Sequence, residues 1–252
     1  MKLLTLARDL KRRKSRERQR LFVAEGVRAV EEVLRSPVRL RGALASPMLD
    51  ATPRGSALRH ALADGGVALL DVAEPDFASA ADTDSPQGIL AIGEVPDRSL
   101  ETLALPPEAR ILVLDAVQAP GNVGTLLRTA AALGATATIA LPGTVDLWNA
   151  KVVRSAMGTL FRHPAIAATW DELATFLDRQ DVALWAADAG GQPVSRASAP
   201  ARLAIAVGNE GGGLSASVRA RAERVVSLPI AADVESLNVA VAAGILLHEL
   251  RR

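Results

Sequence analysis

The sequence predicts an α/β protein of two domains joined by a short linker. Short apolar runs of strand length alternate with runs of helical spacing along most of the 252 residues. A stretch with three prolines and mixed charge interrupts this alternation near residue 100. We therefore expect an N-terminal domain at residues 1–95, a linker at 96–109 and a C-terminal domain at 110–252.

The N-terminal domain begins with a basic segment and continues as strands separated by helices. The expected strands are 21–26, 38–45, 67–72 and 88–95. Helices are expected at 27–34, at 53–64 and from Glu74, where apolar spacing or proline and glycine residues mark them. Because strands alternate with helices, a small and mostly parallel sheet is expected.

The C-terminal domain opens with Ile111–Val117, an apolar run suited to a strand buried on both faces. Further strands are expected at 136–141, 165–168, 182–187, 203–207 and 225–228. Helices are expected at 125–133, 146–157, 171–180 and after Ser236. Two loops, GNVGTLLR and GNEGGGLS, each follow a strand. Ligands bind at the carboxyl ends of strands in open α/β sheets, so these loops predict a binding site.

The segment 203–252 carries the strongest signs of that site. Gly208 and the glycines after it let the main chain turn where side chains would clash. Asn209, Glu210, Ser236 and Asn238 are polar groups between strongly apolar runs, as in a pocket where a few polar groups orient a ligand. The alternative is a set of ordinary turns. Ser236 would then be a helix N-cap and Glu210 a first-turn carboxylate favoured by a helix dipole.

Composition excludes several classes of protein. Cysteine is absent, which removes disulfides, thiolate nucleophiles and cysteine-based zinc sites. His60, His163 and His248 lie far apart, so we expect no metal site. No apolar run reaches membrane-spanning length and the N-terminus does not read as a signal peptide, so we expect a cytoplasmic protein without membrane contact. The GxxxxGK[ST] and GxSxG patterns are also missing.

Positive charge is concentrated near the N-terminus. Residues 8–20 hold eight basic and two acidic residues, although the whole chain has a net charge of only +1. Such a segment is a candidate for contacting RNA phosphates, because each neutralised phosphate releases counterions. The alternative is a solvated helix end. The candidate RNA-binding residues are Arg12, Arg13, Lys14, Arg16, Arg18 and Arg20.

Three stretches of the C-terminal domain read DAVQAPGNVGTLLRTAAALGA, AIAVGNEGGGLS and SLPIAADVESLNVAVAAGILLHEL. In this order they resemble the motifs of the SpoU/TrmH family of RNA ribose 2′-O-methyltransferases, within the SPOUT superfamily. The N-terminal stretch KRRKSRERQRLFVAEGVRAVEEVL resembles the start of an L30e-like substrate-binding domain. That domain is found in family members that act on large-subunit ribosomal RNA.

The resemblance implies a C-terminal parallel sheet with a deep trefoil knot, preceded by a smaller L30e-like α/β domain. S-adenosyl-L-methionine would bind in the knot, and the protein would be a homodimer that buries Val241, Ile245 and Leu246 of the last helix. By motif position, the cofactor-binding residues are Gly208, Leu228, Ile230 and Leu237. The matching catalytic residues are Asn122, Arg128, Glu210, Ser236 and Asn238.

The implied function is S-adenosylmethionine-dependent methylation of a ribose 2′-hydroxyl in 23S rRNA, at a guanosine. Arg128 would fix a phosphate and stabilise the developing alkoxide, since a guanidinium keeps its proton too firmly to act as a base. Simpler interpretations remain open, with Asn122 as a turn residue and Arg128 as a solvated side chain. Two other functions also remain open: a non-catalytic RNA-binding or ribosome-assembly factor, and a tRNA 2′-O-methyltransferase.

Recognition of RNA by stacking on aromatic side chains is not expected. Tyrosine is absent and aromatic residues make up only 3% of the chain. We therefore expect charge, shape and loop insertion to carry recognition.

Overall fold

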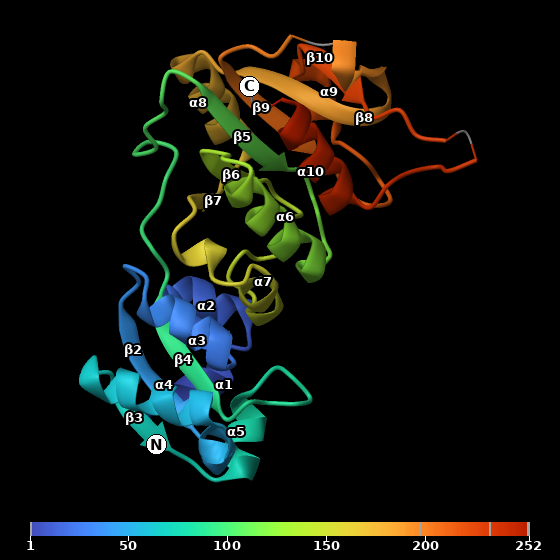
Figure 1. Ribbon diagram of the computed structural model, residues 1–252. Helices are drawn as coiled ribbons and strands as arrows, with labels where there is room; N and C mark the ends of the chain where they lie inside the picture. Colours follow the sequence, from blue (N-terminus) through green and yellow to red (C-terminus); the bar gives the residue numbers. More distant parts are fainter. Residues whose placement is uncertain (1, 197, 232, 251–252) are drawn as a thin grey trace. The chain divides into compact units, whose positions relative to one another are not determined.

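The computed structural model describes residues 2–196, 198–231 and 233–250 (Figure 1). The chain forms two compact units. The first unit is Met1–Asp97 with Trp148–Arg162, and the second is Arg98–Leu147 with His163–Arg252. The segment Trp148–Arg162, expected in the C-terminal domain, thus belongs with the first unit. It is held there by aromatic contacts, because the rings of Trp148 and Phe161 lie 4.5 and 5.6 Å from that of Phe22.

The first unit contains a four-stranded sheet in the order β1-β4-β2-β3. Its strands are β1 (Leu21–Glu25), β2 (Leu40–Ala45), β3 (Leu69–Asp71) and β4 (Ile89–Glu94). β4 lies between β1 and β2 and runs antiparallel to both, while β2 and β3 are parallel. The expectation of a mostly parallel sheet was therefore wrong here. The cause is that β4, the last strand of this unit, lies between β1 and β2 and runs in the opposite direction to both.

Short helices complete the first unit. They are α1 (Lys2–Asp9), α2 (Arg13–Gln19), α3 (Val27–Leu34), η1 (Pro47–Ala51), α4 (Pro53–Asp64), α5 (Glu74–Ala80), α7 (Ala150–Ser155) and η2 (Thr159–Phe161). The apolar face of α1 packs against α5 and β4, where Leu4, Phe77 and Leu90 share one core cluster. The basic segment is therefore helical and is anchored to the sheet by α1.

The second unit contains a six-stranded sheet in the order β10-β8-β9-β5-β6-β7, with every recorded pair parallel. Its strands are β5 (Ala109–Leu114), β6 (Ala137–Ala140), β7 (Ala165–Ala167), β8 (Ala183–Pro193), β9 (Arg202–Val207) and β10 (Arg224–Ser227). All six residues of β5 are buried, as its apolar run predicts. The predicted parallel sheet is confirmed.

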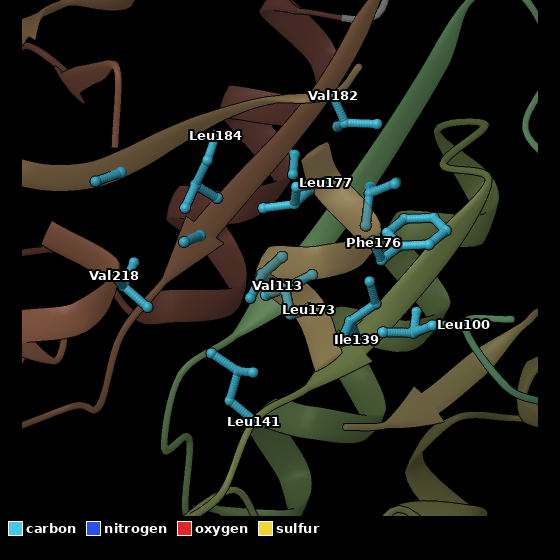
Figure 2. Close-up of a cluster of buried hydrophobic side chains, with 14 of the residues drawn as sticks. Leu100, Val113, Ile139, Leu141, Leu173, Phe176, Leu177, Val182, Leu184 and Val218 are labelled. Atoms are coloured by element: carbon cyan, nitrogen blue, oxygen red, sulfur yellow. The ribbon is translucent and has the colours of Figure 1, made fainter. Parts of the chain in front are cut away.

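The helices of the second unit are α6 (Pro120–Ala132), α8 (Trp170–Gln180), α9 (Ala216–Arg221) and α10 (Val239–Glu249), with a short η3 (Val194–Arg196). Figure 2 shows how the apolar face of α8, with Leu173 and Phe176, packs on the sheet beside Val113. Thr169 and Glu172 form a capping box that starts α8. Within the described part of the chain, no helix is both long and apolar enough to cross a membrane.

Several element boundaries differ from the expected ones. α6 begins at Pro120, five residues before the expected start, because proline suits the first turn of a helix. β8 runs on to Pro193, past the expected end at 187. α7 is shorter than the expected helix at 146–157, since it begins after Asn149, whose side chain accepts a hydrogen bond from the Lys151 backbone.

Candidate functional site

A cavity of about 420 Å³ opens in the second unit, where β8, β9 and β10 lead into their loops. This size lies within the range of small-molecule sites. The start of α10 forms another part of its wall. The cavity is lined by every residue predicted to bind the cofactor and by three of the predicted catalytic residues: Gly208, Leu228, Ile230, Leu237, Glu210, Ser236 and Asn238.

The loop after β9 brings main chain rather than side chain to the cavity wall. A Cβ atom added to Gly208 would lie 2.3 Å from the carbonyl carbon of Gly213, so this position admits only glycine. Asn209 and Gly213 exchange two backbone hydrogen bonds of 2.9 Å. The Asn209 side chain accepts hydrogen bonds from the next two glycine N–H groups and donates one to the Ala116 carbonyl. The loop is therefore held in one shape.

Three polar side chains, one from each predicted motif, form a continuous hydrogen-bonded chain. The Asn238 Nδ2 donates to Asn122 Oδ1 at 3.1 Å. The Asn122 Nδ2 in turn donates to Glu210 Oε1 at 2.9 Å. Asn122 lies in the first turn of α6, Glu210 in the loop after β9, and Asn238 immediately before α10. This chain fixes the orientation of each amide and ends on a carboxylate. We call it the Asn–Asn–Glu chain.

Glu210 caps a helix to which it does not belong. Its carboxylate accepts hydrogen bonds of 3.3 Å from the backbone N–H groups of Gln118 and Ala119, which lie just before α6. Partial burial acts to raise the pKa of Glu210, but hydrogen bonds from the Asn122 side chain and from nearby backbone N–H groups hold that pKa below its usual value. Glu210 is therefore an ionised acceptor at neutral pH. The alternative interpretation, a carboxylate favoured by a helix dipole, therefore applies to Glu210, but the helix is α6 and Glu210 is not one of its own first-turn residues.

The cap of α10 is Asn238 and not Ser236. The Asn238 side chain accepts a hydrogen bond of 2.9 Å from the Ala240 backbone. Ser236 lies two residues earlier, exposed on the cavity wall. The N-cap interpretation of Ser236 was therefore wrong, because Asn238 occupies the N-cap position. Asn238 is at the same time a member of the Asn–Asn–Glu chain.

Arg128 does not join the Asn–Asn–Glu chain. It is exposed on α6 and makes no ion pair with any residue that the structure describes. Six residues after Asn122, it lies roughly 120° around the helix from that side chain. The first helix motif therefore directs Asn122 to Glu210 and Asn238, and leaves Arg128 exposed to solvent.

Two aspartates of the site were not singled out from the sequence. Asp188 lines the cavity, and its carboxylate accepts hydrogen bonds from Gly190 N–H and from Arg219, which together hold its pKa below the usual value. Asp115, buried at the end of β5, accepts a 2.6 Å hydrogen bond from the Ser215 backbone. Asp188 directly follows the predicted strand 182–187, and this place is the signal that marks it, whereas Asp115 lies within the predicted strand 111–117 and carries no such signal.

The basic segment presents most of its predicted RNA-binding side chains to solvent. Arg12, Lys14 and Arg18 are exposed and have no ion-pair partner among the described residues. Arg13 pairs with Glu17, and Arg20 pairs with Asp97. Arg16 was wrongly placed on this surface. It is only 6% exposed, and its guanidinium donates to the backbone carbonyls of Leu10 and Lys11 between α1 and α2.

Part of the face predicted for dimerisation is exposed. Val241 and Ile245, one turn apart on α10, are 51% and 40% exposed. Leu246 is buried within its own subunit and lines the cavity, so its assignment to that face was wrong. No group of side chains suited to hold a metal ion occurs among the residues described.

Residues 109–248 match the model of the SpoU rRNA Methylase family. The chain belongs to this family. Residues 5–91 match a second model, the MRM3-like substrate binding domain, which is found at the N-terminus of this SpoU member.

Several methyltransferases are similar to this chain over nearly its full length. The 23S rRNA (guanosine(2553)-2′-O)-methyltransferase RlmP of Bacillus subtilis is 34% identical, with 97% of this chain and 94% of that protein covered. The AdoMet-bound SpoU methyltransferase AviRb of Streptomyces viridochromogenes is 25% identical with a TM-score of 0.88, covering 99% and 96%. An AdoMet-bound rRNA methyltransferase of Sinorhizobium meliloti is 27% identical with a TM-score of 0.86, covering 99% and 94%.

Proposed function

We propose that this protein transfers a methyl group from S-adenosyl-L-methionine to the ribose 2′-hydroxyl of a guanosine in 23S rRNA. The observation that carries the proposal is the Asn–Asn–Glu chain beside a cavity shaped by main chain. The known activity of RlmP, similar over nearly the full length of both chains, supports the same substrate. We also infer that the protein works in the cytoplasm, where ribosomal RNA is found.

The cavity fits a cofactor held mainly by main-chain groups. Gly208 lets the Gly213 main chain approach closely and so shapes the cavity wall, and Leu228, Ile230 and Leu237 provide apolar surface. When bound, S-adenosyl-L-methionine supplies an electrophilic methyl group on a sulfonium. These four residues would hold it, and Asp188 is ionised on the same wall.

The Asn–Asn–Glu chain would orient the ribose of the target nucleotide. Asn122 and Asn238 have fixed amides because their partners are set, so they can present a hydrogen-bond donor or acceptor without a conformational search. Glu210 keeps Asn122 in its orientation and stabilises the start of α6. Ser236, exposed on the same wall, would contact the substrate.

Arg128 is free to bind RNA because no described carboxylate pairs with it. We propose that it fixes a phosphate of the target nucleotide through two parallel hydrogen bonds, and that the 2′-hydroxyl proton leaves through phosphate or water. Arg128→Lys keeps the charge and removes the paired geometry. Methyl transfer should fall by about tenfold or more if the two-pronged contact matters. Near-full activity of Arg128→Lys would contradict this role.

The knot and the dimer are parts of the same proposal, as are domain boundaries at residues 95 and 110. After β10, at one edge of the sheet, the chain returns so that α10 packs against α6 and the Leu250 carbonyl accepts a hydrogen bond from Arg110 in β5. That return path supports a threaded chain end. The exposed pair Val241 and Ile245 supports a second copy of the chain as the partner of α10.

The deciding experiment combines calorimetry with methyl transfer. The purified protein is titrated with S-adenosyl-L-methionine and then given 23S rRNA with a radiolabelled methyl donor, and the modified position is mapped by primer extension at low nucleotide concentration. We expect cofactor binding and one 2′-O-methylated guanosine. Cofactor binding without transfer to rRNA would favour an RNA-binding or assembly factor, and transfer to tRNA alone would favour the tRNA enzyme.

A further inference from the structure

The first unit contains a second cavity, of about 230 Å³, where β1 ends and α3 begins. Three segments distant in sequence line it. The β1–α3 junction contributes Glu25 and Arg28, the loop before β4 contributes Gln87, and the α7 segment contributes Arg154 and Met157. The cavity is therefore complete only when Trp148–Arg162 is docked on the first unit.

The walls of this cavity are fixed by hydrogen bonds. Gly26 adopts a φ of +95°, and an added Cβ would lie 3.0 Å from Gln87 Oε1. That same oxygen accepts a 2.9 Å hydrogen bond from the Val27 backbone at the start of α3. The Glu25 carboxylate accepts hydrogen bonds from the Asp82 and Thr83 backbones at 2.7 and 3.4 Å. The pocket is thus built before any ligand arrives.

The cavity has a buried acidic side chain and two exposed basic side chains. Glu25 is only 5% exposed, and burial raises the pKa of its carboxyl, while backbone hydrogen bonds and the nearby charge of Arg154 oppose that shift. Arg28 and Arg154 are exposed and make no ion pair with a described carboxylate. The cavity therefore offers a deep acceptor with unused lone pairs and two cations accessible to solvent.

This arrangement selects among the parts of an RNA chain. Exposed guanidinium groups suit phosphates, whereas a buried carboxylate repels them and needs hydrogen-bond donors. An unstacked base offers donors on its Watson–Crick edge. Guanine presents two adjacent donors, N1–H and the N2 amino group, which match the two oxygens of one carboxylate. On the same edge of adenine, cytosine and uracil, each donor has an acceptor beside it, so these bases do not offer two adjacent donors to a carboxylate.

We propose that this cavity binds an unpaired guanine base of the RNA substrate, with its Watson–Crick edge on Glu25 and its flanking phosphates on Arg28 and Arg154. Met157 and Ala29 supply apolar surface for the base. The site recognises RNA and takes no part in methyl transfer. It rests on the proposed function only in requiring that RNA is the substrate. It also explains how a chain with 3% aromatic residues can distinguish a base without aromatic stacking.

The test measures binding of fluorescently labelled pentanucleotides UUGUU, UUIUU and UUAUU to the full-length protein by anisotropy. Inosine lacks the N2 amino group of guanosine and is otherwise the same. The wild type should bind UUGUU about tenfold more tightly than UUIUU, the loss expected for one hydrogen bond to a charged group. UUAUU should bind at least as weakly as UUIUU. Equal binding of UUGUU and UUIUU, or no binding of UUGUU, overturns the proposal without any variant.

Two variants and one control test whether the preference for guanine comes from this cavity. Glu25→Gln should remove the preference for UUGUU, while the exposed Glu74→Gln on α5 should keep it. Arg154→Gln should weaken all three oligonucleotides alike and reduce the dependence of binding on salt. A guanine preference unchanged in Glu25→Gln also overturns the proposal. S-adenosyl-L-methionine affinity, measured by calorimetry on each variant, tests the proposed function separately and should not change.

Discussion

The Asn122 side chain donates a hydrogen bond of 2.9 Å to Glu210, a residue 88 positions later in the chain. The same carboxylate accepts from the backbone just before α6, so one residue stabilises the start of a helix and orients its first polar side chain. Stability and the geometry of the proposed active site are therefore coupled through Glu210.

Glu210→Gln should damage both properties. An amide keeps the size of the side chain but loses the charge at the helix start, and its NH₂ group can face N–H donors. We expect a loss of about 1 kcal/mol in the free energy of unfolding. Single-turnover methyl transfer should fall roughly 100-fold, because Asn122 loses its orientation. Urea unfolding and transfer assays would check this, with the exposed Glu223→Gln as the control. Full activity of Glu210→Gln would contradict the coupling.

Gly208→Ala should weaken cofactor binding with little effect on the rest of the fold. The added Cβ would lie 2.3 Å from the Gly213 backbone, which has to move and change the cavity wall. Gly211→Ala is the matched control, since its Cβ would lie 3.7 Å from Asn209 Oδ1, an ordinary contact. Calorimetry with S-adenosyl-L-methionine should give at least about tenfold weaker binding for the first variant. Equal affinities in the two variants would show that the loop does not shape the site.

His163 should make the protein sensitive to mild acid. Burial, with a smaller effect from the charge of Arg98, lowers the pKa of His163 from 6.5 to about 4. The unfolded chain therefore takes up this proton first, so stability falls as pH drops from 6.5 to about 4. The loss of unfolding free energy should be about 3 kcal/mol. His163→Gln should flatten the dependence of urea midpoint on pH, and the exposed His60→Gln should not. A dependence that persists in His163→Gln would point to another group.

Gly158→Ala should loosen the attachment of the α7 segment to the first unit. Gly158 has a φ of +86°, and an added Cβ would lie 2.6 Å from the Cβ of Glu32 in α3. Gly66→Ala provides the comparison, since Gly66 has a φ of +67° but open space around it. Both variants lose about 1 kcal/mol to the backbone conformation, and Gly158→Ala should lose more. Limited proteolysis should cut the segment near residue 150 in Gly158→Ala only.

Val241→Glu combined with Ile245→Lys should leave a stable monomer. Both side chains are exposed in one subunit, so charge on them costs little within that subunit, while a shared apolar face would be disrupted. Analytical ultracentrifugation of wild type and variant would measure the change in mass. Ala231→Glu, an exposed change in the loop before α10, serves as the control. A wild type that sediments as a monomer would remove the dimer from the proposal.

Local sequence patterns were sufficient to predict the second unit and much of its site. Apolar runs such as β5 identify strands of a parallel sheet because both faces are covered. Glycine at 208 and polar residues after each strand marked the loops, and Gly208, Glu210 and Asn238 do line one cavity. These features depend on residues close together in sequence, so they can be read without the fold.

Features that depend on distant partners could not be predicted. The contact of Glu210 with the backbone just before α6 joins residues 91 positions apart. The antiparallel direction of β4 depends on the two strands that it separates. Arg16 looked like its basic neighbours, yet the turn between α1 and α2 buries it. The helix around Lys151 was expected beside its sequence neighbours in the second unit. Its true partner, through Trp148, is an aromatic ring 126 residues earlier.

The stacking of Trp148 and Phe161 on Phe22 has a consequence for synthesis of the protein on the ribosome. Phe22 is fully buried in the finished fold. While the nascent chain is shorter than about 160 residues, Trp148 and Phe161 have not both been added, so their part of the cover over that ring is missing. The N-terminal unit therefore keeps an incompletely covered apolar surface until the α7 segment is translated, after β5 and β6 of the second unit.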